Sequence, residues 1–117
     1  MKNWPQDTKE LTAQLRNLRG GATEVMKAFS AMAQAAVAAN ALDSKTKELI
    51  ALGIAVAVRC EDCIGFHVKA AMERGASADE VTEVLGMAIY MGAGPSVMYA
   101  SHALQAFAQF KNAAPKT

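Results

Sequence analysis

The chain has 117 residues, of which 52% are hydrophobic and 20% are charged, and its formal net charge is +1. This composition is typical of one globular domain with a modest core, which we expect to span residues 1–117, and it excludes a disordered chain. A charge so close to zero gives no reason to expect nucleic acid or an anionic membrane surface as a partner.

The distribution of helix formers and breakers predicts an all-α fold of about six helices. Alanine, the best helix former, occurs 25 times, and no long stretch alternates apolar and polar residues as a strand would. The first helix is expected at about 7–19 and the second at about 23–39, with a break at two glycines between them. The segments 1–6 and 112–117 are expected to be frayed.

The third helix is expected to be the central and most buried one. It begins after Asp43 or Ser44, either of which can cap it, and reaches about Val58. Residues 49–58 are apolar without interruption, but this run of ten is far shorter than the roughly 20 residues needed to cross a bilayer. No apolar signal segment with a cleavage site follows the first residue, so we expect a cytoplasmic protein.

The last three helices are delimited by glycine, proline and one capping box. The fourth is expected at about 62–74, where a glycine ends it. Ser77 and Glu80 have capping-box spacing and open the fifth helix. The glycine-rich segment 92–94 breaks that helix, and a proline then suits the first turn of a sixth helix at about 95–110.

Cys60 and Cys63, the only two cysteines, are the most informative residues of the chain. In a chain that is not secreted, C-x-x-C spacing favours redox or metal chemistry over a structural staple. His67 follows four residues after Cys63, so the two share one helix face. A helix N-terminus favours the reactive thiolate, whereas Glu61 and Asp62, as like charges, oppose its formation.

Glu48 stands at the head of the apolar run, so its carboxylate is expected to be partly buried. The imidazole of His67 can accept a thiol proton or stabilise the thiolate, and Glu48 could orient that imidazole. Cys60 is close enough to form a disulfide with Cys63 once one sulfur has been oxidised. These residue types supply a nucleophile, a resolving thiol, a base and an orienting carboxylate.

The pattern of Glu48, eleven residues, Cys60-x-x-Cys63, three residues and His67 resembles the motif of the AhpD-like alkylhydroperoxidases, which belong to the carboxymuconolactone decarboxylase family. The resemblance covers about residues 40–110. It implies that Cys63 is the peroxidatic cysteine, which attacks the O–O bond and becomes a sulfenic acid. It also implies that Cys60 is the resolving cysteine and that Glu48 and His67 relay protons.

The resemblance further implies a thiol-dependent peroxidase that reduces hydrogen peroxide or organic hydroperoxides and is reset by an external dithiol or disulfide reductant. It implies a homotrimer or homohexamer, and no metal, haem, flavin or nucleotide cofactor. One position departs from the pattern, because Asp62 stands where doubled, longer relatives have a second histidine. The lactone decarboxylases of this fold lack the cysteine pair, so the resemblance does not carry that activity to this chain.

The apolar content also predicts an oligomer. A chain of this size buries somewhat under 70% of its unfolded surface, and a third helix that is apolar all round is hard to enclose. The second and sixth helices add Phe29, Met32, Met98, Tyr99 and Phe107. Some of this surface should therefore lie outside the core of any monomer, as interfaces do.

Other functions fit the same cysteines. The pair could switch an interface as a redox sensor, or exchange disulfides with little peroxidase turnover. A zinc site would need four ligands, so His102 or a carboxylate would have to join Cys60, Cys63 and His67. The two thiols could also be inert and buried.

Overall fold

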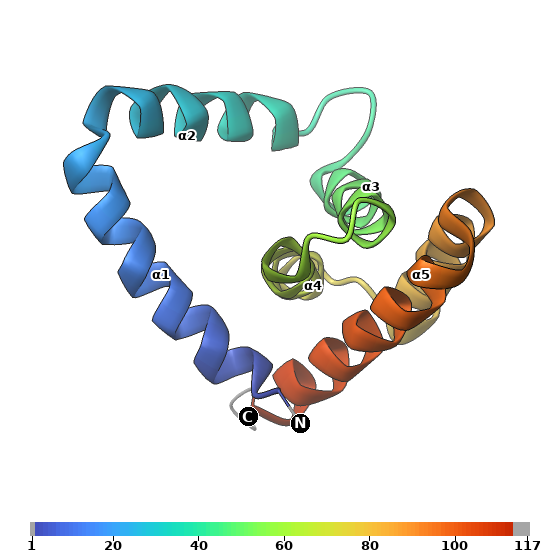
Figure 1. Cartoon of the computed structure of the whole chain (residues 1–117). Coiled ribbons are helices and arrows are strands. Elements are labelled where there is room, and N and C mark those ends of the chain that lie inside the picture. The colour runs from blue at the N-terminus through green and yellow to red at the C-terminus, as the bar shows by residue number, and fades with distance from the viewer. Residues whose placement is uncertain (1, 114–117) are drawn as a thin grey trace.

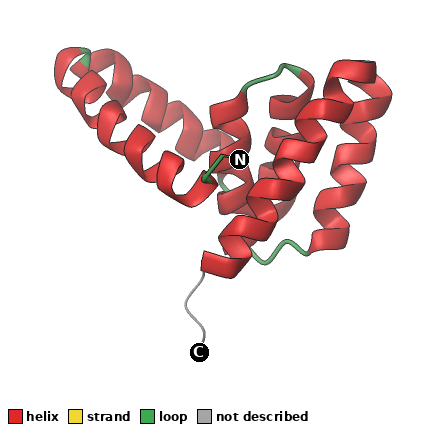
Figure 2. Cartoon of the chain, turned by 60° about the horizontal axis from the view of Figure 1, so that its bottom comes forward, coloured by secondary structure: helices red, strands yellow, loops and turns green. Residues whose placement is uncertain are grey.

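A computed structural model describes residues 2–113 of the chain, and every regular element in that range is a helix (Figures 1 and 2). The elements in chain order are α1 (Trp4–Gly21), α2 (Thr23–Val37), α3 (Ser44–Ala57), α4 (Glu61–Glu73) and α5 (Ala78–Ala113). The predicted all-α class is confirmed. Within residues 2–113, no helix combines the length and the apolar character needed to cross a membrane.

The core lies where α3, α4 and α5 pack against one another. From α3 it takes Leu49, Leu52, Ala55 and Val56, which meet buried residues of α4 and α5. The opposite side of α3 is uncovered in the single chain, where Ile50 is 47% and Ile54 57% exposed. The helix is central, as predicted, but one chain encloses only part of its apolar surface.

Two predicted helix starts are confirmed by their hydrogen bonds. The amide of Thr46 donates to Oδ1 of Asp43 at 2.7 Å, which caps α3. This bond is the main reason that the pKa of Asp43 lies below its usual value. The amide of Ser77 donates to Oε1 of Glu80 at 2.9 Å, and the amide of Glu80 donates to Oγ of Ser77 at 3.1 Å.

The number of helices differs from the expected six because the two expected on either side of residues 92–94 form one element. The break is in the predicted place, since Ala93 has φ 58° and ψ −146° inside α5. Gly92 permits this bend because it has no side chain. A Cβ at this position would lie 2.0 Å from Oγ of Ser96 and would clash with it. The helix therefore kinks at Ala93 and continues, so residues 2–113 form five helices.

The prediction of frayed ends is wrong where the structure describes them. Trp4 begins α1 and is only 1% exposed, and the other end of the chain is helical as far as Ala113. The Trp4 amide donates to Oε1 of Gln109 at 2.7 Å, and the indole Nε1 donates to Oε1 of Gln105 at 2.8 Å. A single buried tryptophan makes no periodic pattern, so this anchor could not be predicted from the sequence. Residues 1 and 114–117 lie outside the described range.

Trp4→Ala is expected to lower the free energy of unfolding by about 3–5 kcal/mol, because it removes a large buried side chain and leaves a cavity. Urea unfolding at one fixed protein concentration measures this change. Gln14→Ala on the exposed side of the same helix is the control and should stay within about 0.5 kcal/mol of wild type. Equal stabilities of the two variants would contradict the anchoring role of Trp4.

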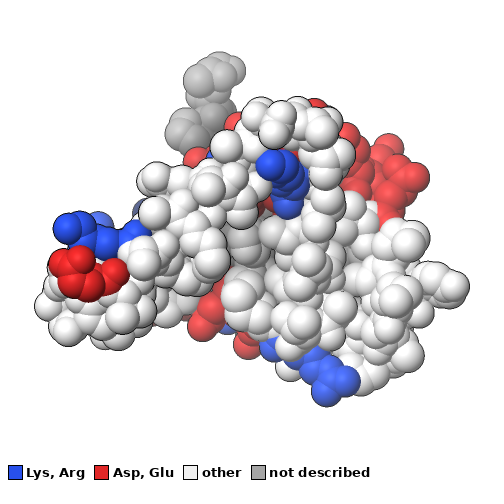
Figure 3. Space-filling model, turned by 90° about the horizontal axis from the view of Figure 1, so that it is seen from above, with Lys and Arg blue, Asp and Glu red and all other residues white. Residues whose placement is uncertain are grey.

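The pair α1 and α2 forms an arm that reaches away from the other three helices (Figure 1). The predicted apolar stripe of the second helix is present, but no residue of α2 is buried. Its Val25, Phe29 and Met32 are 70%, 56% and 60% exposed. Viewed from the α2 side, most of the visible surface carries neither acidic nor basic side chains (Figure 3). The arm therefore presents an apolar helix face that the rest of the chain does not cover.

Candidate active site

The two cysteines lie at the start of α4, joined by a disulfide with their Cα atoms 5.2 Å apart. A tight turn brings them there: Arg59 adopts a left-handed conformation with φ 63°, and the Cys60 amide donates to the carbonyl of Ala55 at 2.9 Å. Cys60 is the N-cap residue, and its Sγ accepts a hydrogen bond from the Cys63 amide at 3.3 Å. Both cysteines are half-buried, so the sulfur pair sits in the field of the helix N-terminus within reach of solvent.

Glu48 and His67 form the second pair of the site. Oε2 of Glu48, on α3, lies 2.9 Å from Nδ1 of His67, on α4. The carboxylate is buried, at 5% exposure of the side chain, whereas the imidazole side chain is 33% exposed. An ionised carboxylate can only accept, so Nδ1–H then donates to Glu48 and Nε2 remains the free ring nitrogen. The expectation that Glu48 is buried is confirmed, and the histidine is its partner.

The four predicted residues thus come together as two pairs on neighbouring helices. Cys63 and His67 are four residues apart on α4 and so share one face of that helix. A pocket of about 400 Å³ opens beside Glu48, between the last turn of α2 and the first turns of α3. Its lining residues are Ala33, Gln34, Val37, Ala38, Ser44, Glu48 and Arg74. This arrangement can hold a redox-active sulfur pair next to a proton-transfer pair.

Lys2, which the sequence did not mark as a site residue, faces the first turn of α4. Its Nζ lies 3.8 Å from Oε2 of Glu61 and 3.9 Å from Oδ1 of Asp62. Nδ1 of His102 lies 3.4 Å from the other oxygen of Glu61. About 60 residues separate Lys2 from this turn in the sequence, so no local pattern could have found it. No group of three histidine, cysteine or acidic side chains within residues 2–113 is arranged to hold a metal ion.

Comparisons with known proteins agree with this architecture. The model of the carboxymuconolactone decarboxylase family matches residues 23–106. An uncharacterized protein of Cupriavidus necator, H16_B0147, is 39% identical over 98 residues, which are 84% of this chain and 87% of that protein.

Two solved structures are similar over nearly the whole chain. The apo form of lpg0406, a carboxymuconolactone decarboxylase family protein of Legionella pneumophila, is 49% identical with a TM-score of 0.90, covering 94% of this chain and 98% of that one. TM1620 of Thermotoga maritima, a protein of the same family for which a role in an antioxidative response has been suggested, is 27% identical with a TM-score of 0.83, covering 91% of each chain.

Proposed function

The chain belongs to the carboxymuconolactone decarboxylase family, and we propose that within this family it acts as an AhpD-like thiol peroxidase, reducing hydrogen peroxide or organic hydroperoxides. The observation that carries the proposal is the Cys60–Cys63 disulfide at the N-terminus of α4, with a hydrogen-bonded Glu48–His67 pair beside it. A cytoplasmic location is part of the proposal, because a catalytic disulfide there can be returned to the dithiol.

The first step oxidises Cys63 and reduces the peroxide. The Cys63 thiolate attacks one oxygen of the O–O bond, an S–O bond forms, and the O–O bond breaks. The sulfur becomes a sulfenic acid, and the leaving oxygen takes a proton to become water or an alcohol. His67, whose Nδ1 is held by Glu48, is positioned to take up the thiol proton and return one to the leaving oxygen through Nε2.

The second step forms the disulfide that is present in the structure. The Cys60 thiol attacks the Cys63 sulfenic acid, an S–S bond forms, and the sulfenic oxygen leaves as water. An external dithiol then reduces the disulfide by two thiol–disulfide exchanges and becomes a disulfide itself. The cycle thus transfers two electrons from the dithiol to the peroxide.

Peroxide consumption under excess dithiol tests this function. A peroxidase consumes many equivalents of peroxide for each chain, at a rate proportional to the protein concentration. A redox switch, the second candidate for the same cysteine pair, is not returned to the dithiol form by this reductant on the timescale of the assay, so it consumes one equivalent and stops. If consumption ends at one equivalent while dithiol is still in excess, the peroxidase proposal is wrong and the switch is favoured.

We also propose that the protein is a homotrimer or homohexamer, with the apolar face of α2 covered by a second copy of the chain. The isolated chain exposes 7494 Å², well above the roughly 6,100 Å² expected for a compact monomer of 12.3 kDa. A second uncovered apolar surface is a groove of about 390 Å³ between α3 and α5, whose lining includes Ile50, Ile54 and Met91. Apolar surface of this extent is typical of a subunit interface.

Size-exclusion chromatography with light scattering should give a mass three or six times the 12.3 kDa of one chain. Phe29→Glu places a charge in the exposed apolar face of α2 and should lower that mass at micromolar concentration. Gln14→Glu adds the same charge at an exposed position of α1 and is the control that should keep the wild-type mass. A wild-type mass near 12.3 kDa would refute the oligomer.

A further inference from the structure

Two carboxylates stand directly beside the sulfur pair. Glu61 and Asp62 separate the two cysteines in the sequence and form the first turn of α4. The N-terminus of that helix favours an anion on sulfur, whereas two negative charges in the same turn oppose one. The groups that face these two carboxylates therefore decide how strongly the site favours a thiolate.

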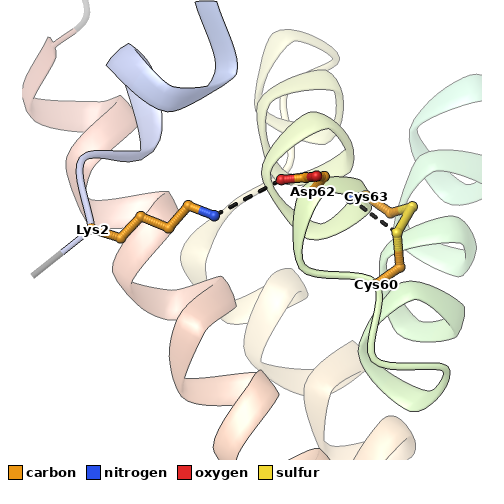
Figure 4. The surroundings of a disulfide bond; sticks show 4 residues. All are labelled: Lys2, Cys60, Asp62 and Cys63. Atoms are coloured by element: carbon orange, nitrogen blue, oxygen red, sulfur yellow. Dashed lines mark hydrogen bonds and ion pairs between the residues drawn. A yellow bond between two sulfur atoms is a disulfide. The ribbon is translucent and has the colours of Figure 1, made fainter. Parts of the chain in front are cut away.

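The ammonium group of Lys2 lies close to both carboxylates. Nζ of Lys2 is 3.8 Å from Glu61 and 3.9 Å from Asp62. Figure 4 shows Lys2 reaching across from the segment before α1, with Asp62 between the ammonium group and the disulfide. The Lys2 side chain is 27% exposed, whereas those of Glu61 and Asp62 are 44% and 64% exposed, so salt screens these ion pairs.

Lys2 is held in this place by contacts with the rest of the fold. Its carbonyl accepts a hydrogen bond from Nε2 of Gln109 at 2.7 Å, and its Nζ lies 4.4 Å from the centre of the Trp4 ring. The ring in turn packs against Gly65 of α4, where a Cβ would lie 3.0 Å from Cε3 of Trp4. Lys2 is therefore positioned by contacts with Gln109 of α5 and Trp4 of α1.

His102 faces the remaining oxygen of Glu61. Its Nδ1 is buried without a hydrogen-bond partner among the described residues, and it lies 3.4 Å from Oε1 of Glu61. The ring is held by Tyr99 in an edge contact, with ring centres 5.4 Å apart. The Glu61 carboxylate is the charged group beside this nitrogen, and the two form an ion pair when the imidazole is protonated. Glu61 thus lies near both Lys2 and His102.

We propose that Lys2 and His102 are positioning residues of the cysteine pair: Lys2 neutralises the acidic first turn of α4 and His102 orients Glu61, so that the helix N-terminus favours the Cys63 thiolate. This inference rests on the proposed thiol chemistry, but it concerns the ionisation of the thiol and not its reaction with peroxide. The titratable groups around the sulfur pair are Lys2, Glu48, Glu61, Asp62, His67 and His102.

The test measures the pKa of Cys63 as the only thiol, in a Cys60→Ser background, from the pH dependence of alkylation by iodoacetamide. Lys2→Gln should raise the pKa of the Cys63 thiol by about 0.5, which leaves about threefold less thiolate at a pH well below it. Lys2→Arg should restore the wild-type value, and 1 M salt should shrink the effect of Lys2→Gln. His102→Leu should raise the pKa by less, because it releases Glu61 without removing a positive charge.

Lys9→Gln is the matched control, because it removes the same charge from an exposed lysine of α1 that makes no ion pair with the described residues. An equal pKa shift in Lys9→Gln, or no shift in Lys2→Gln with native Trp4 fluorescence, would overturn the inference. Alkylation needs no peroxide, so the two proposals can fail separately. A Lys2-dependent pKa in a protein without peroxide turnover would keep this inference and reject the peroxidase.

Discussion

Cys63→Ser should reduce peroxide consumption under excess dithiol to the rate of a protein-free control. A serine hydroxyl is not ionised near neutral pH and cannot form a sulfenic acid, so neither the first step nor the disulfide remains possible. The substitution changes one atom in the first turn of α4, and the amide that donates to Cys60 Sγ is retained. Circular dichroism and the oligomeric mass should therefore be unchanged. Residual turnover at the wild-type rate would show that Cys63 is not the nucleophile.

Cys60→Ser should behave differently from Cys63→Ser, because the two cysteines occupy different positions at the start of α4. Cys60 caps α4 and Cys63 lies in its first turn, on the face of His67. Cys60→Ser should consume one equivalent of peroxide and stop, with a sulfenic acid on Cys63 that dimedone traps and mass spectrometry locates. An adduct formed on Cys60 in Cys63→Ser, with none on Cys63 in Cys60→Ser, would reverse the assignment of the two sulfurs.

Features that depend on neighbours in the sequence could be predicted from the sequence. The caps at Asp43 and at Ser77 with Glu80 were expected from three-residue patterns, and each is formed by the expected bonds. The same holds for the placement of Cys63 and His67 on one face of α4, which requires only helix periodicity. The burial of Glu48 followed from the apolar run behind it.

Features that depend on distant contacts could not be predicted. Trp4 is anchored by glutamines more than 100 residues away, and Lys2 meets Glu61 and Asp62 only because that anchor brings the N-terminus to α4. The apolar stripe of α2 predicted an apolar helix face. It did not indicate that the rest of the chain leaves this face uncovered. Helical periodicity in the sequence identifies the apolar face of a helix, but tertiary or quaternary packing decides which element covers that face.

Substitutions in the Glu48–His67 pair should also have a large effect on the rate of the reaction with peroxide. Glu48→Gln and His67→Ala should each slow the reaction with peroxide by about 10²- to 10⁴-fold while keeping the fold. Glutamine retains the size of Glu48 and can still bond Nδ1, but it lacks the negative charge that stabilises the imidazolium. Alanine removes the base altogether, and the pKa of the Cys63 thiol should rise in that variant. Stopped-flow measurement of the first oxidation separates this step from the later reduction.

Because Oε2 of Glu48 and Nδ1 of His67 are bonded at 2.9 Å, the two residues should act as one unit. The double variant should therefore react with peroxide at about the rate of the slower single variant. If the two residues acted independently, their fold losses in rate would multiply. Glu83→Gln removes an exposed carboxylate from α5 and is the control, which should react at the wild-type rate. Wild-type rates in both single variants would make the pair structural. Multiplied losses in the double variant would mean that Glu48 acts on the reaction by a route other than His67.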